Sequence, residues 1–284
     1  MAETFERVLR PNRAWLRLDV VGLRRYSDLL FLLVRRDFVA RYQQTVLGPA
    51  WFILQPLIQT VAYTLVFGQV LGVPTDGIPP FLFYQCGVLS WTYFSNVLGI
   101  VGNTFGANTN LFTKVYFPRL IVPLSVVISN LFTFVVQGAT FLVFYFSFVL
   151  KGGMGAGLHF DFLALALLPL ALLQSAALAL GVGFLTSALS AKYRDLQQVV
   201  PFLVNIWMFA TPVIYPLSQL GRRARWVAGL NPMSTVVESF RIAFFGVGTA
   251  RPGEIVLSVA TTLVVLLVGF AMFQRAERTF VDTV

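Results

Sequence analysis

The sequence feature that most constrains this chain is a series of long segments without any charged side chain. After Arg41 the next charged residue is Asp76, and segments of similar length recur toward the C-terminus. A helix needs about 20 mostly apolar residues to cross the hydrocarbon core of a bilayer. Only 12% of all residues are charged, against about 25% in soluble domains. The sequence therefore predicts an integral membrane protein.

Six segments have the length and composition of a membrane span, and links rich in proline, glycine or charge separate them. The predicted spans cover residues 50–71, 81–102, 120–150, 162–191, 199–217 and 254–273. The predicted fold is all-α: a polytopic membrane protein with one membrane domain over residues 1–284. Between the fifth and sixth spans, residues 218–253 are predicted to form short extracytoplasmic helices.

The distribution of basic residues predicts the orientation. With both termini in the cytoplasm, 15 of the 21 Lys and Arg residues lie in cytoplasmic segments and six lie outside. Cytoplasmic loops of membrane proteins carry such an excess. Five of the six exceptions fall within residues 218–253. Two alternatives follow: a basic element outside the cytoplasm, or a fifth span that turns back without crossing, for which Pro201, Pro212 and Pro216 leave room.

Residues 1–49 are predicted to form a cytoplasmic arm that ends in an interface helix. The helix is expected over residues 27–47: Ser27 is a suitable N-cap residue, and apolar side chains follow it at helical spacing. They are Phe31, Val34, Phe38 and Tyr42. This pattern favours a helix along the inner membrane surface, and the alternative is a partly ordered basic arm. Gly48 and Pro49 end the segment, and Pro49 suits the first position of the next helix.

Several kinds of chemistry are excluded. The chain has one histidine, which rules out a metal cluster or triad built on histidines, and no Gly-Lys pair, which rules out a phosphate-binding loop. Its one cysteine, Cys86, cannot form an internal disulfide. The span interiors lack the ionisable side chains that proton-driven transporters use as relays. Any transport is therefore expected to draw its energy from a partner protein, and no cofactor is expected in this chain.

The net charge of +9 is carried mainly by arginines. In a membrane protein such charge faces anionic lipid and the cytoplasm. Nucleic acid is not expected as a partner, because the basic residues do not form a nucleic-acid-binding module.

Polar and aromatic side chains inside the spans mark a candidate transport path. Gln55, Gln59 and Tyr63 repeat every four residues, and Phe67 follows, so they share a face of the first span. The candidates in other spans are Tyr84, Trp91 and Trp207. Such a set favours the wall of a glycan path, where aromatic rings stack on sugar faces and amides bind hydroxyls. The alternative is that amides join helices and that Trp and Tyr mark the membrane interfaces.

A second candidate element lies in residues 218–253. Glu238 and Arg241 stand at positions i and i+3 of a helix-like stretch, Ser234–Phe245. One interpretation is a pair of membrane-surface helices that gates an exit. The alternative is a solvated helix with an exposed ion pair, which contributes little to stability.

Several short motifs, in this order, resemble those of ABC-2 type permease subunits, in the branch that exports bacterial polysaccharides such as lipopolysaccharide O-antigen, capsule or teichoic acid. They are Arg35-Arg36-Asp37 with Arg41-Tyr42, Leu47-Gly48-Pro49-Ala50-Trp51 with Gln55-Pro56, Asn110-Leu111, Lys114-Val115-Tyr116-Phe117-Pro118-Arg119 with Pro123-Leu124, Tyr193-Arg194-Asp195 with Pro201-Phe202, Pro212-Val213-Ile214-Tyr215-Pro216, and Leu230-Asn231-Pro232 with Glu238. Each motif alone is weak evidence, but their order and spacing together are specific.

The resemblance implies a homodimer of six-span subunits in the bacterial inner membrane. It also implies two ATP-binding cassette ATPase subunits, which bind ATP and magnesium in place of this chain. The implied substrate is a polyprenyl-diphosphate-linked glycan that moves from the cytoplasmic to the periplasmic face. Membrane lipid is a further implied partner.

By the same resemblance, the loop of residues 103–119 includes a coupling helix that docks on the ATPase. The implied coupling residues are Arg35, Arg36, Asp37, Arg41, Asn110, Lys114, Tyr116, Phe117 and Arg119. The short helices after the fifth span supply the candidate gate. Its residues are Arg222, Arg223, Arg225, Glu238 and Arg241.

Two other functions remain open from the sequence. An ABC-2 exporter of a small lipid or drug would share the architecture. A membrane-embedded glycosyl- or acyltransferase would need carboxylates or a histidine near the interface, and the candidates Asp76, Asp161 and His159 do not form a motif.

Overall fold

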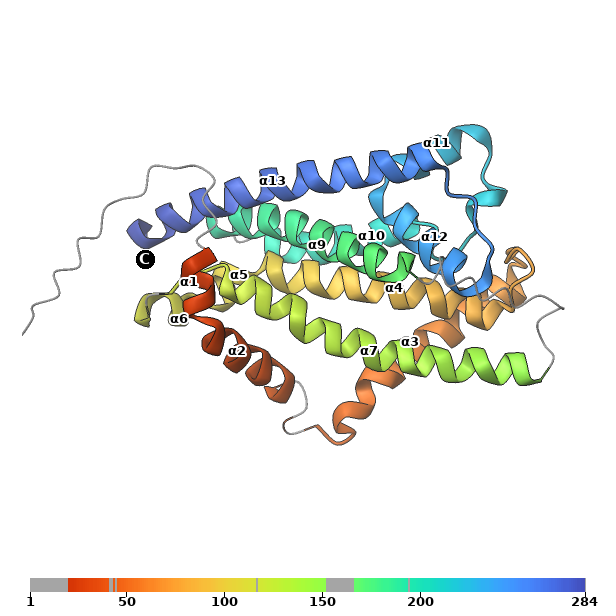
Figure 1. Ribbon diagram of the computed structural model, residues 1–284, viewed down its shortest axis with the longest axis horizontal. Coiled ribbons are helices and arrows are strands. Elements are labelled where there is room, and N and C mark those ends of the chain that lie inside the picture. The colour runs from red at the N-terminus through yellow and green to blue at the C-terminus, as the bar shows by residue number, and fades with distance from the viewer. Residues whose placement is uncertain are drawn as a thin grey trace, which may run out of the picture.

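The computed structural model describes residues 20–40, 43, 45–115, 117–151, 166–193 and 195–283. Over these residues the chain folds into helices and turns, without a β-strand, so the predicted all-α class is confirmed. Four long helices run lengthwise beside one another (Figure 1). They are α4 (Pro80–Gly102), α7 (Ile121–Leu150), α9 (Leu167–Lys192) and α13 (Pro252–Thr283).

Among the described residues, four segments are long and apolar enough to cross a membrane. They are Gly48–Val70, α7, α9 and the part of α13 from Pro252 to Arg278. The first joins a 3-10 turn, η1 (Gly48–Ala50), to α3 (Trp51–Tyr63) and to a π-helical segment, η2 (Thr64–Val70). These four segments correspond to the first, third, fourth and sixth predicted spans.

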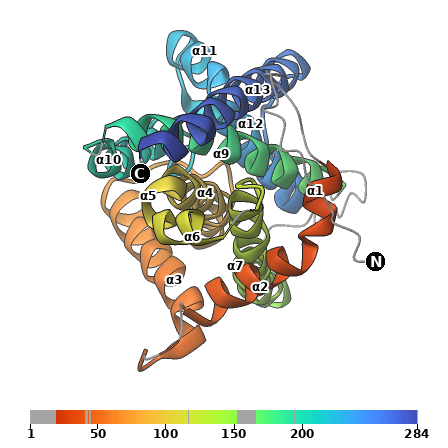
Figure 2. The same ribbon diagram turned by 90° about the vertical axis from the view of Figure 1, so that its left-hand side faces the viewer.

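The second predicted span is α4, the central helix of the bundle. Sixteen of its 23 residues are buried. It packs against α3, α7, α9 and α12 (Pro232–Phe245), and Figure 2 shows it near the centre of the bundle. At 1.5 Å per residue it is about 34 Å long, which is enough to cross a bilayer. Because neighbouring helices cover most of α4, it can carry Gln85, Ser90, one Trp and two Tyr side chains, and it is not among the four described segments that are apolar enough to cross a membrane.

The fifth predicted span differs most from its expected form. The helix there, α10 (Leu196–Phe209), has 14 residues and is about 21 Å long. It ends before Pro212, because the residue preceding a proline disfavours helical backbone angles. A turn and a short 3-10 helix, η3 (Leu217–Gln219), follow. The count of six spans therefore depends on α4 and α10 and stays a prediction.

The path of the chain around α10 bears on the turning-back alternative. Figure 1 shows the chain leaving α9 at one end of the bundle and entering α13 at the opposite end. Between them lie α10, η3, α11 (Arg222–Leu230) and α12 (Pro232–Phe245). This segment passes from one end of the bundle to the other, so in this structure α10 does not return to the end at which it starts.

The closest packing between long helices is that of α9 on α13, at two glycines. A Cβ atom added to Gly181 would lie 2.8 Å from the Leu266 backbone, and one added to Gly269 would overlap the Gly181 carbonyl oxygen. Small residues let helix backbones approach this closely in membranes. The sequence places no larger side chain at either contact, so the two helices touch backbone to backbone.

The first described helices, α1 (Val20–Arg25) and α2 (Ser27–Ala40), pack at the end of the bundle where α13 finishes (Figure 1). Two short helices, α5 (Thr104–Ala107) and α6 (Thr109–Lys114), lie at the same end. Leu33 of α2 is buried together with Phe117, Ile121 and Val122. The helix predicted over residues 27–47 forms from Ser27 to Ala40, and the prediction is wrong for residues 45–47, which are not helical. Its predicted stripe is divided: Val34 is buried, Phe31 and Phe38 are exposed, and Tyr42 lies outside the described residues.

Gly48 makes the elbow between α2 and α3. Its φ angle is +51°, in the left-handed region that glycine adopts at little cost. A Cβ atom there would meet nothing within 4 Å, so the backbone angle rather than crowding requires glycine. Pro49 follows within η1, in agreement with its predicted place at the start of a helix.

Candidate functional site

A hollow of about 750 Å³ lies among α3, α4, α7 and α10. Its wall combines side-chain amides, hydroxyls and aromatic rings. The lining residues are Trp51, Phe52, Gln55, Pro56, Gln59, Tyr63, Trp91, Thr92, Ser95, Asn96, Ile100, Thr133, Gln137, Asn205 and Met208. Four of the seven residues predicted for the glycan path, Gln55, Gln59, Tyr63 and Trp91, are among them.

The polar face of α3 is joined to α10 across this hollow. Gln59 Nε2 donates a hydrogen bond to the Tyr63 hydroxyl at 2.8 Å, as their spacing of four residues allows. The hydroxyl in turn contacts Met208 Sδ of α10 at 3.4 Å. The structure thus brings Gln55, Gln59 and Tyr63 together on one side of the hollow, and their role in transport stays a prediction.

Other predicted path residues lie outside the wall of the hollow. Trp207 Nε1 donates to Asn231 Oδ1 at 3.1 Å, and its ring packs edge-on against Phe94 with centroids 5.1 Å apart. Tyr84 is fully buried in the core, and Phe67 packs against Tyr63. Trp207 and Tyr84 thus make packing contacts inside the bundle, which neither interpretation specified for them.

Several lining residues did not enter the predicted path. Asn96 and Gln137 each have a threonine four residues earlier, Thr92 and Thr133, and all four side chains line the hollow. Asn205 has no such neighbour in α10, so periodicity could assign only two of the three to a face. Gln137 is buried, whereas Asn96 and Asn205 are exposed, and their meeting at one hollow depends on how α4, α7 and α10 are packed around α3.

The candidate coupling residues fall into two groups. Arg35, Arg36, Asn110 and Lys114 are exposed at the end of the bundle that holds α1, α2, α5 and α6. Asp37 is half-buried and pairs with Arg36 at 2.8 Å. Phe117 and Arg119 are buried, so they lie behind the exposed group. Arg41 and Tyr116 are outside the described residues.

Arg119 joins the predicted coupling loop to the last long helix. Its Nη1 donates to the Glu277 carbonyl oxygen of α13 at 2.7 Å. Its guanidinium carbon lies 5.3 Å from the centroid of the Phe112 ring and 6.0 Å from that of Phe105. Arg119 thus fixes α5 and α6 to α13 from inside.

The candidate gate residues Glu238 and Arg241 form a buried ion pair. Both residues are 2% exposed, and Arg241 Nη1 lies 3.0 Å from Glu238 Oε1. The prediction of a solvated helix with an exposed pair is therefore wrong. Burial lowers the pKa of the Arg241 guanidinium, and the Glu238 carboxylate partly opposes this shift. Arginine stays protonated in proteins.

The pair also holds the turn after α10 and the loop before α13. Arg241 Nη2 donates to the Val213 carbonyl oxygen at 3.1 Å, and the Thr249 backbone N–H donates to Glu238 Oε2 at 3.0 Å. The guanidinium carbon lies 3.9 Å from the centroid of the Phe83 ring of α4. One ion pair therefore connects α4, α12 and two connecting segments.

The three arginines of α11 are placed differently. Arg225 faces α13, where its Nε lies 3.7 Å from Glu254 Oε1. Arg222 and Arg223 are exposed on the other side of α11. Trp226, 72% exposed, shares that outer face with them. The outer face is thus both cationic and apolar, a combination typical of helices at a membrane surface.

Comparison with known proteins gives the family. The ABC-2 type transporter family matches residues 28–245, more than half of the 284 residues. The chain belongs to this family. The resemblance drawn from the motifs is thereby confirmed. An ABC-2 type protein with four segments able to cross a membrane is a multi-pass membrane protein.

The relatives of this ABC-2 protein have names from polysaccharide export. The O-antigen export system permease protein RfbA of Myxococcus xanthus is 31% identical over 265 residues, covering 92% of this chain and 97% of the relative. An RfbA of Klebsiella pneumoniae is 26% identical over 255 residues, covering 90% and 94%. The polysialic acid transport protein KpsM of Escherichia coli is 24% identical over 258 residues, covering 88% and 93%.

Proposed function

We propose that this ABC-2 protein is the membrane-spanning permease subunit of an ATP-driven exporter of a lipid-linked, O-antigen-like polysaccharide. The observation that carries the proposal is the hollow beside α3, whose amides, hydroxyls and aromatic rings suit sugar hydroxyls and sugar faces. The names of the relatives favour this substrate over a small lipid or drug, and over a glycosyltransferase activity.

The proposed assembly has two copies of this chain and two ATP-binding cassette ATPase subunits. The ATPases bind ATP and magnesium, since this chain has no phosphate-binding loop. Six spans would cross the bacterial inner membrane, with both termini in the cytoplasm. The exposed apolar side chains of α3 and α10, among them Ile58, Phe202 and Ile206, are available to contact lipid or the second copy.

The proposed mechanism follows from the two ends of the bundle. ATP-driven closure of the ATPases pushes on α2 and on the loop that contains α6. The two permease subunits then move relative to each other across α3 and α10, and the hollow admits a polyprenyl-diphosphate-linked glycan from the cytoplasmic side. The sugar chain leaves at the end that holds α11 and α12, on the periplasmic side.

The proposal is tested with the full-length permease and its ATPase reconstituted in lipid vesicles. Glycan linked to polyprenyl diphosphate is expected to stimulate ATP hydrolysis and to become accessible on the far side of the membrane. Replacing Gln59 by leucine is expected to lower this stimulation, because a buried amide that binds hydroxyls contributes about 1 kcal/mol, or about fivefold. Lack of stimulation by every polyprenyl-linked glycan tried would contradict the proposal.

A separate expectation concerns coupling. Lys114 is exposed on α6, and an exposed ion pair is worth up to about 1 kcal/mol. Lys114→Ala is expected to weaken ATPase docking by up to about fivefold and to lower export per ATP hydrolysed. Lys151→Ala, at the exposed far end of α7, is the matched control and should leave docking unchanged. If both variants bind the ATPase equally well, Lys114 is not part of the coupling surface.

A further inference from the structure

The hydrogen bonding around Pro56 shows how α3 is held to the rest of the bundle. Pro56 lies inside α3 and has no N–H, so the Phe52 carbonyl loses the donor that an α-helix normally provides four residues later. Gln137 of α7 supplies one: its Nε2 donates to the Phe52 carbonyl oxygen at 3.3 Å. A side chain of a neighbouring helix thus replaces the hydrogen bond that the proline removes.

Beyond this contact, α3 is built to bend and is loosely packed. Thr60 is its one fully buried residue. The Thr60 hydroxyl donates to the Pro56 carbonyl at 2.7 Å and the Thr64 hydroxyl to the Thr60 carbonyl at 2.8 Å, contacts that bend helices. The π-helical segment η2 then continues the helix. A helix with a proline, two such threonines and a π-segment has several places at which its direction can change.

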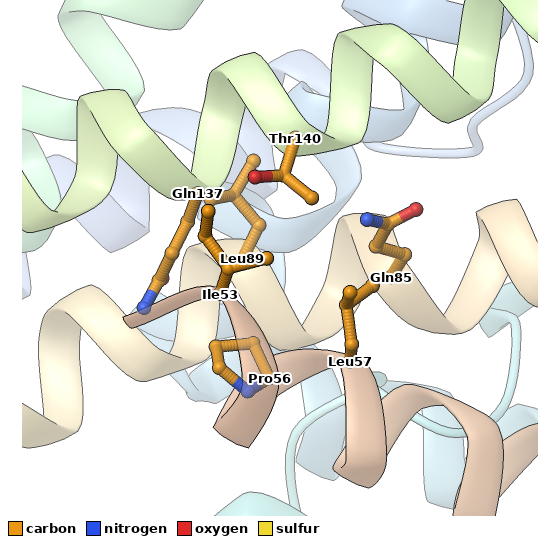
Figure 3. A pocket seen from close by; sticks show the side chains of 7 residues that line it. All are labelled: Ile53, Pro56, Leu57, Gln85, Leu89, Gln137 and Thr140. Atoms are coloured by element: carbon orange, nitrogen blue, oxygen red, sulfur yellow. The ribbon is translucent and has the colours of Figure 1, made fainter. Parts of the chain in front are cut away.

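A second, much smaller cavity lies behind the Pro56 contact (Figure 3). Its volume is about 10 Å³, at the lower limit of what one water molecule needs. Figure 3 shows Gln137 reaching from α7 toward α3, with Gln85 of α4 on the other side of the cavity. Pro56 and Gln137 line both this cavity and the 750 Å³ hollow. They therefore separate the two spaces.

Gln85 makes the separated arrangement less stable. It is 5% exposed, and its Oε1 is buried without a hydrogen-bond partner in the described structure. A buried polar atom left unpaired is destabilising by about 1–3 kcal/mol. Movement of α3 away from α4 and α7 would join the small cavity to the hollow and let water or a hydroxyl group reach Gln85. In the observed arrangement the Gln137 hydrogen bond favours the closed position of α3, whereas the unpaired Gln85 oxygen favours its movement.

We propose that Gln137 is a positioning residue: it holds α3 against α7 by replacing the hydrogen bond that Pro56 removes, and its release lets α3 move outward and open the small cavity to the hollow. This inference rests on the proposed function in one respect only: the purpose of the movement, which is a wider passage for the glycan. The placement of α3 itself is a property of the permease alone.

The test measures the opening of the small cavity in the full-length permease, without ATPase or glycan. Cys86, the one cysteine of the chain, is replaced by serine, and Leu89→Cys is introduced as a probe. Leu89 lines the small cavity and is 3% exposed, so its reaction with a water-soluble maleimide reports opening. Gln137→Met removes the donor at similar length and is expected to raise the labelling rate about fivefold, the effect of one hydrogen bond.

A second background, in which Pro56 is replaced, decides whether Gln137 acts through Pro56. Pro56→Ala restores an N–H that can pair with the Phe52 carbonyl inside α3. In that background Gln137→Met is expected to leave the labelling rate unchanged. An equal increase with and without Pro56 would overturn the proposal, because Gln137 would then act through general packing. No increase in either background would overturn it as well.

Two further variants keep the test decisive. Thr140→Val is the matched control, since Thr140 lines the same cavity but its hydroxyl bonds the Val136 carbonyl of its own helix; its labelling rate should equal that of the parent. If Gln137→Met does not fold, Gln137→Leu, which also has no donor, takes its place with the same expected result. Failure of the glycan-stimulated ATPase experiment would leave these labelling results untouched.

Discussion

Replacing Arg241 by methionine is expected to lower the stability of the permease by about 3–5 kcal/mol, because it leaves the Glu238 carboxylate buried without a positive partner. It also removes the donor to the Val213 carbonyl oxygen and the contact with the Phe83 ring. For a protein of this size the loss corresponds to a fall in melting temperature of roughly 6–20 °C. Thermal unfolding of the purified full-length chain measures it.

The matched control is Arg223→Met, since Arg223 is exposed on α11 and surface changes usually stay within about 0.5 kcal/mol. Combining Arg241→Met with Glu238→Leu should recover part of the loss, because removing both partners of a buried pair is far less harmful than removing one. An Arg241→Met protein that melts with the parent would show that the pair does not hold the turn after α10.

The second large effect is expected at the contact between α9 and α13. Gly269→Ala places a methyl group on the Gly181 carbonyl oxygen, and neither backbone can move aside without separating the helices. The expected cost is about 3 kcal/mol or more, at the upper end of overpacking, with low yield in the membrane. Yield and melting temperature of the purified variant measure it.

Gly138 of α7 is the matched control for this prediction. A Cβ atom there meets nothing within 4 Å, so Gly138→Ala should be neutral or stabilising by up to about 1 kcal/mol, the difference in helix propensity. Equal loss in the two variants would mean that glycine flexibility, rather than backbone contact, is what these helices need.

The sequence was sufficient where one helix determines the geometry. Gln55, Gln59 and Tyr63 share a face because a helix repeats every 3.6 residues, and the structure places all three on the hollow. The sequence was not sufficient where a neighbouring helix determines which contacts a side chain makes. Trp207 is an aromatic residue of the kind expected in a glycan path. Its indole N–H instead donates to Asn231, 24 residues later.

The Glu238–Arg241 pair shows the same limit more sharply. The spacing i, i+3 is identical for an exposed pair and a buried one, so periodicity could not choose between them. Ten of the 14 residues of α12 are buried, and the apolar residues Val236, Val237 and Phe240 around the pair were the available signal. The reason for burial, the approach of Phe83 and of the turn at Val213, depends on packing between distant segments.

The length of α10 was predictable only in part. Pro212 and Pro216 indicate an irregular backbone, but a hydropathy window averages over them and gives one apolar segment up to Leu217. The helix stops at Phe209, and Thr211 uses its hydroxyl to bond the Trp207 carbonyl. Local side-chain bonds of this kind weaken and bend helices, and they are invisible to an average over apolar residues.

The unbroken course of α4 has a mechanical consequence. Its C-terminal end leads directly into α5, whose Phe105 stacks on Phe273 of α13, and its N-terminal end brings Phe83 to Arg241. No proline interrupts the helix after Pro80, and an uninterrupted helix behaves as a stiff rod. We expect α4 to carry a displacement along its axis from one end to the other, so that a load applied near Asn103 reaches the contact between Phe83 and Arg241.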